Sequence, residues 1–162
     1  MPTVRRDGES FRKLPENQHE IVLRDRKGPD VRLPAQPVGP TMPHDLMHAV
    51  VETALGIEDG FWGATARGAT FQGFLLVTPG RHRRSGLKVL RRDGDAVLAA
   101  ELRVNWAYRV WRGLPTEGRG AGPALLTAYE PARTGPRLDA AAARWAAVPE
   151  GGALVRRWGT DR

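Results

Sequence analysis

Four prolines spaced three residues apart divide the chain into two unlike parts. Pro34, Pro37, Pro40 and Pro43 each hold their own φ near about −65° and bias the preceding residue away from the helical region. No regular helix can run through residues 34–43, so we expect an extended linker there. Short alternating apolar runs come before this linker, and apolar residues at helical spacing follow it.

The apolar patterns on either side of the linker predict the elements. Strands are expected over residues 19–24 and 30–33, which form a hairpin, over 70–79 as a buried strand, and over 153–158. Helices are expected over residues 43–55, 87–92, 96–111, 123–130 and 137–148, with a turn at 60–63. This order lacks the regular alternation of a doubly wound sheet. We therefore predict an α+β fold, with a small antiparallel sheet and helices packed on one of its faces.

The chain of 162 residues has the length of one domain. Residues 1–18 are polar and are expected to form a flexible N-terminus, followed by a single globular domain over 19–162. The lack of cysteine excludes a disulfide scaffold, an iron–sulfur cluster and a cysteine nucleophile. The sequence has no apolar run of membrane-spanning length and no apolar secretory segment near its start, so we expect a soluble cytoplasmic protein.

His44 and His48 lie four residues apart in the helix expected over 43–55. At about 100° per residue, both imidazoles leave the same face of the helix, at the edge of its apolar stripe. Two imidazoles one turn apart chelate zinc or another divalent transition metal when a carboxylate completes the site. Asp45, Glu52 and Glu101 are the carboxylates that we consider for the third ligand.

Residues 44–48 also resemble the HExxH helix of metalloproteases, with Asp45 in place of the glutamate that acts there as general base. Aspartate is shorter by one methylene, and the downstream ligand pattern of those proteases is absent. The sequence therefore does not indicate a protease. The alternative is that both histidines are structural and satisfy hydrogen bonds at the edge of the core.

Glu101 falls at the centre of an apolar stripe in the helix expected over 96–111, between Val97, Val104 and Tyr108. A carboxylate buried in such a stripe has to be paired or bound to a metal. We therefore expect Glu101 to be buried with a perturbed pKa, and we name it with Asp45 as a candidate catalytic residue. The alternative is a structural pair with an arginine or a tyrosine.

The net charge of +7 comes almost entirely from arginine, with 22 arginines against 3 lysines. The basic excess is concentrated in residues 81–112 and includes Arg81, Arg83, Arg84, Arg91 and Arg92. Basic and aromatic side chains together suit contacts with phosphates and stacked bases, so a non-enzymatic module that binds nucleic acid or an acidic partner is the alternative function. No known nucleic-acid-binding fingerprint accompanies this segment. A third alternative is a protein–protein adaptor whose interface is marked by exposed Trp62 or Trp111.

Residues 43–52, PHDLMHAVVE, and residues 60–63, GFWG, resemble the PHDLxHxxVE and GFWG motifs of a small uncharacterised bacterial family. The C-terminal pattern from Trp145 to Trp158 is similar to that family's ending. The resemblance implies no activity. The residues themselves favour a metal-binding protein, or a small metalloenzyme, that uses His44 and His48 with a carboxylate.

Overall fold

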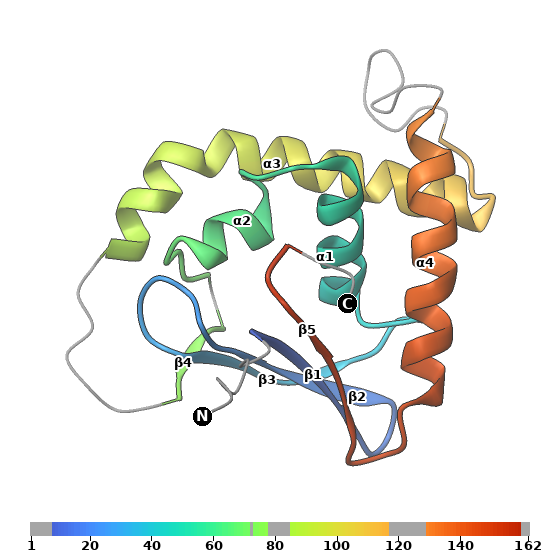
Figure 1. The fold of residues 1–162 in the computed structure, drawn as a ribbon, viewed down its shortest axis with the longest axis horizontal. Coiled ribbons are helices and arrows are strands. Elements are labelled where there is room, and N and C mark those ends of the chain that lie inside the picture. The colour runs from blue at the N-terminus through green and yellow to red at the C-terminus, as the bar shows by residue number, and fades with distance from the viewer. Residues whose placement is uncertain (1–7, 72, 78–84, 117–128, 160–162) are drawn as a thin grey trace, which may run out of the picture.

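The computed structural model describes residues 8–71, 73–77, 85–116 and 129–159, with the backbone alone for 85–93. Within these residues, five strands form one antiparallel sheet in the order β4-β3-β2-β1-β5, and four helices lie on one side of it (Figure 1). The strands are β1 (Glu9–Leu14), β2 (Gln18–Leu23), β3 (Val31–Pro37), β4 (Leu75–Leu76) and β5 (Ala153–Arg156). The helices are α1 (His44–Leu55), α2 (Phe61–Ala66), α3 (Ser85–Arg112) and α4 (Glu130–Ala147). The predicted α+β fold is confirmed.

The core lies between one face of the sheet and the helices. Along β1 and β3 the side chains alternate, so that Phe11 and Leu33 are buried while Arg12 and Arg32 are exposed. The buried strand residues pack against apolar side chains of α1 and α4. Each such side chain contributes about 1.5–3 kcal/mol when fully buried. The sheet and these two helices therefore form the rigid base on which the other elements sit.

The prediction of a flexible N-terminus over residues 1–18 is wrong for the part that the structure describes. Residues 9–14 form β1, which pairs with β2 on one side and β5 on the other. Glu9 looks like a surface residue in the sequence, but it is buried and paired with Arg156 of β5. This partner is 147 positions away in the chain, so no local pattern marks the strand. Residues 1–7 lie outside the described residues.

The predicted hairpin is confirmed, although β3 extends further than expected and runs into the proline-rich segment. Pro34 and Pro37 lie in β3, beyond the two positions where β3 pairs with β4. The missing N–H of a proline is tolerated at such an edge. The expected linker therefore begins only after Pro37.

The part of the chain after the linker differs from the prediction in four places. Among the residues of the expected buried strand 70–79 that the structure describes, only β4 is a strand, and its two leucines are exposed. The expected turn at 60–63 is the start of α2, and α3 runs without a break through 93–95. α4 begins seven residues earlier than expected and includes Pro136. Most of the short helix expected over 123–130 lies outside the described residues. None of the described helices is both long and apolar enough to cross a membrane.

Candidate metal centre

Helix α1 places the two histidines. Its first turn follows Pro43, and Gly56 ends it in the left-handed conformation with φ of 66°. The apolar stripe of Leu46, Val50 and Val51 is buried, and this sets the rotation of the helix about its axis. The histidines therefore lie at the edge of the core, as the sequence predicted, with His48 buried and His44 exposed.

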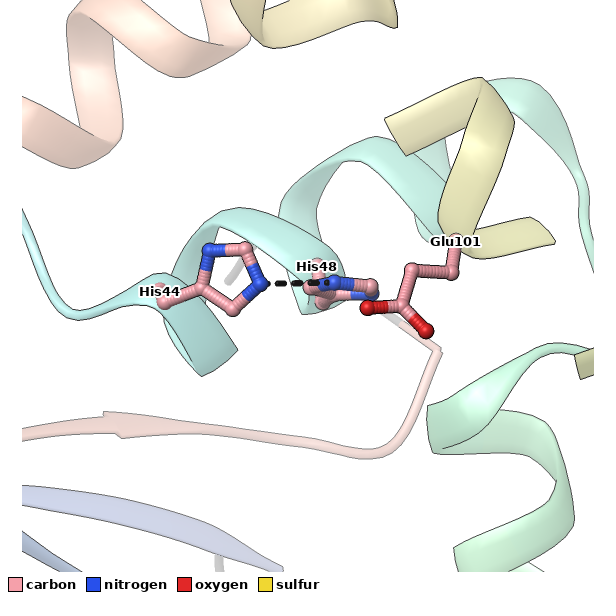
Figure 2. Close-up of side chains that lie close together, drawn as sticks. All are labelled: His44, His48 and Glu101. Carbon is pink, nitrogen blue, oxygen red and sulfur yellow. Dashed lines mark hydrogen bonds between the residues drawn. The ribbon is translucent and has the colours of Figure 1, made fainter. Parts of the chain in front are cut away.

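The rings of His44 and His48 meet edge to face, and their Nε2 atoms are 3.1 Å apart (Figure 2). Glu101 projects from α3 toward the same point. One ligand atom from each of His44, His48 and Glu101 lies within 4.8 Å of the other two. Two helices that are far apart in the sequence thus bring three metal-ligating side chains together.

Glu101 belongs to this group, but the prediction that it is buried is wrong, because the carboxylate is exposed. Over residues 94–112, whose side chains the structure describes, the buried stripe of α3 consists of Ala100, Val104 and Ala107, and it lies about 90° around the helix from Glu101. Small alanines let α3 approach its neighbours closely, whereas Leu98 and Leu102 are exposed. The predicted stripe shares Val104 with the buried one, but it left out the two alanines and was therefore rotated toward Glu101.

Glu52 is not among the three clustered ligands, although the sequence predicted it as a candidate ligand. It is 2% exposed and lies behind His48, with Oε2 3.3 Å from Nδ1 of that ring. Its Oε1 accepts the backbone N–H of Trp62 at 3.1 Å. Glu52 is thus placed to orient His48, as the carboxylate partners of metal-bound histidines do.

Asp45, the other candidate catalytic residue, is half-buried and also lies outside the three-ligand group. Burial raises the pKa of Asp45, while His48 and His44 act in the opposite direction. Desolvation lowers the pKa of His44, and the neighbouring His48 lowers it further. A lowered pKa keeps His44 in the neutral form, which is the form that binds metals.

The sequence predictions gave Phe61 and Trp62 no part in this site, but both contact it. The ring centroids of Phe61 and His48 are 6.0 Å apart, and the backbone N–H of Trp62 donates a hydrogen bond to Oε1 of Glu52. Trp62 is buried, so the expectation that it is exposed at a partner interface is wrong. Trp111 is half-buried and donates to Asp139 through its Nε1–H. The GFWG motif was the sequence signal that could have linked Phe61 and Trp62 to the site.

The basic segment 81–112 is only partly described. Arg81, Arg83 and Arg84 lie outside the described residues, as do the side chains of Arg91 and Arg92. Further along α3, Arg103 is paired with Glu130 at 2.7 Å and Arg109 donates to the carbonyl of Pro115. Binding of nucleic acid or an acidic partner stays a prediction.

Comparison of the chain with known protein families, with curated proteins and with solved structures gives no match. The resemblance of residues 43–52 and 60–63 to a bacterial family therefore stays a prediction.

Proposed function

We propose that this protein binds a divalent transition metal ion between α1 and α3, with zinc as the best fit. The ligands are Nε2 of His44, Nε2 of His48 and the carboxylate of Glu101. The proposal is carried by the convergence of these three groups within 4.8 Å. Two histidines and one glutamate are a donor set that catalytic zinc sites use.

The spacing of the histidines supports this assignment. In a tetrahedral zinc site with Zn–N bonds of about 2.0–2.1 Å, two ligand nitrogens are about 3.3 Å apart. The Nε2 atoms of His44 and His48 are 3.1 Å apart, so one ion fits both with little movement. Glu101 closes the remaining distance by rotating about its own side-chain bonds, which its exposure allows.

The chemistry that we propose is metal-assisted hydrolysis. Three protein ligands leave a coordination position for water, and zinc in such a site lowers the pKa of that water to about 7. His44 and Glu101 are exposed, so a substrate reaches this position from solvent. Asp45 follows His44 directly in α1 and is half-buried, so it would be the nearest candidate to exchange a proton with a water bound there.

Metal analysis of tag-free protein tests the proposal. The unmodified protein is expected to take up about one equivalent of zinc, while His44→Ala and Glu101→Gln each take up far less. Both replaced side chains are exposed, so the fold is expected to survive both changes. Glu58→Gln removes another exposed carboxylate outside the group and serves as the matched control.

The comparison among these variants decides the outcome. Uptake that is equal in all four proteins would assign the zinc to other residues and refute the site. No uptake by the unmodified protein at micromolar zinc would refute the function itself.

A further inference from the structure

We infer that the segment Gly60-Phe61-Trp62-Gly63 is an outer shell of the metal centre, which fixes Glu52 so that His48 presents an unprotonated Nε2 to the ion. This inference rests on the proposed function and adds positioning residues to it. The segment is the GFWG motif, and no side chain in it is a metal ligand of the kind that the site uses. Its effect on the metal is therefore exerted through Glu52 and the ring of His48.

Glu52 is held from two directions. Oε1 accepts the N–H of Trp62, and Oε2 lies 3.3 Å from Nδ1 of His48. Trp62 is anchored in turn, because its indole Nε1–H donates to the carbonyl of Asp45 at 2.8 Å. α2 is thus tied to α1 at two points, and the carboxylate between them has little freedom to rotate.

This arrangement selects one tautomer of His48. A carboxylate oxygen only accepts hydrogen bonds, so Nδ1 of His48 has to carry the proton. The lone pair of the ring is then on Nε2, the atom that faces His44. Carboxylates that orient a metal-bound histidine in this way raise metal affinity, and their loss typically weakens it by about 10–100-fold.

The two glycines of the segment are required for space. A Cβ on Gly60 would collide with the carboxylate of Glu52, with Cδ at 2.7 Å, and would lie 3.0 Å from Cβ of Ala100. The φ of Gly60 is −80°, which any residue adopts, so crowding is the constraint there. A Cβ on Gly63 would collide with the carbonyl of Glu58. Only a residue without a side chain lets α2 approach Glu52 this closely.

Glu52→Gln tests the inference with a side chain of nearly the same shape. The N–H of Trp62 needs an oxygen acceptor, so the amide oxygen of glutamine stays on that side. The amide NH₂ then faces His48 and donates to Nδ1, which moves the ring proton to Nε2. In metal-free protein, ¹⁵N NMR of the histidine rings is expected to show this change of tautomer. Zinc affinity, measured by competition with a chelator, is expected to fall by about 10–100-fold.

Gly60→Ala tests the same inference while every ligand and Glu52 itself are kept. The added methyl displaces the carboxylate, so weaker zinc binding is expected, together with a changed ¹⁵N shift of His48. Gly135→Ala is the matched control, because its Cβ would meet nothing within 4 Å. Glu58→Gln is the control for the glutamate change, since that side chain is exposed. Urea unfolding of each variant shows which ones are folded.

The outcomes separate this inference from the proposed function. If the unmodified protein binds zinc, and folded Glu52→Gln has the same affinity and the same His48 tautomer, the outer shell is refuted while the metal site stands. If no variant binds zinc but Glu52→Gln still changes the tautomer, the metal site is refuted and the orientation of His48 by Glu52 stands. If Glu52→Gln does not fold, Gly60→Ala decides, and zinc affinity equal to that of Gly135→Ala overturns the inference.

Discussion

Two glutamates, Glu9 on β1 and Glu52 on α1, border the same cavity of about 410 Å³ and are almost equally buried, at 1% and 2% exposure. Their partners differ. Glu9 meets the guanidinium of Arg156 at 3.1 Å, and this group is charged at every pH at which proteins are folded. Glu52 meets one backbone N–H and one imidazole.

On the proposed function, this difference separates a structural pair from part of a binding site. A buried carboxylate has to be compensated, and for Glu9 the compensating charge belongs to the fold itself. For Glu52 the partner is a ring whose second nitrogen points toward two further metal-ligating side chains. On the proposed function, a cation at that nitrogen completes the compensation.

The largest expected effect is the loss of the structural pair. Arg156→Ala removes the buried guanidinium that Glu9 meets at 3.1 Å, and the free energy of unfolding is expected to fall by about 3–5 kcal/mol. Urea denaturation monitored by tryptophan fluorescence measures the change. The double variant Glu9→Leu/Arg156→Met, which removes both charges, is expected to cost much less. A single variant that costs under about 1 kcal/mol would contradict the structural interpretation of the pair.

The second largest effect is the stabilisation of the fold by zinc at the proposed site. Zinc at 100 times its Kd is expected to raise the free energy of unfolding by about 2.7 kcal/mol, since it binds only the folded protein. His44→Ala is expected to abolish this zinc-dependent gain, while the stability of the metal-free protein changes by less than about 0.5 kcal/mol. Unfolding with and without zinc measures both quantities. An undiminished gain in His44→Ala would place the bound zinc elsewhere.

The two regions also differ in how far the sequence predicted them. α1 carries its signals within twelve residues, from Pro43 through a periodic apolar stripe to Gly56, so the helix and its His44–His48 pair were predicted correctly. β1 was missed because the burial of Glu9 depends on Arg156 at the other end of the chain. Local patterns predict elements whose stabilising contacts are local.

The same rule holds within the candidate site: features of a single helix were predictable, and contacts between helices were not. The spacing of His44 and His48 is a property of one helix, whereas the orientation of Glu101 depends on which face of α3 packs inward. That face is set by Ala100 and Ala107, which an apolar pattern weights less than leucine or valine. The sequence named Glu52 as a candidate ligand, whereas its position behind His48 follows from its contact with α2. Contacts between elements decide such roles, and a single sequence does not contain them.

Replacing each glutamate with glutamine compares their contributions to stability directly, and the expected effects are smaller. Glu9→Gln replaces the carboxylate beside Arg156 with a neutral amide, and a loss of about 2–3 kcal/mol is expected because hydrogen bonds between charged groups contribute more than neutral ones. Glu52→Gln keeps an oxygen for the N–H of Trp62, so a loss of about 1 kcal/mol or less is expected in metal-free protein. Parallel urea titrations provide the two values. Equal losses would remove the distinction between the pair and the site.

The smallest expected effect uses His19, a buried histidine whose Nδ1–H donates to the carbonyl of Gln36 rather than to a carboxylate. Burial lowers the pKa of His19, so below about pH 6.5 the unfolded chain binds more protons than the folded one. Stability is therefore expected to fall as the pH decreases through this range. We expect His19→Gln to flatten the profile when both proteins carry His44→Ala, which removes the other histidine with a lowered pKa. Identical profiles between about pH 5 and 7 would show that a buried histidine without a carboxylate partner gives the fold no pH dependence.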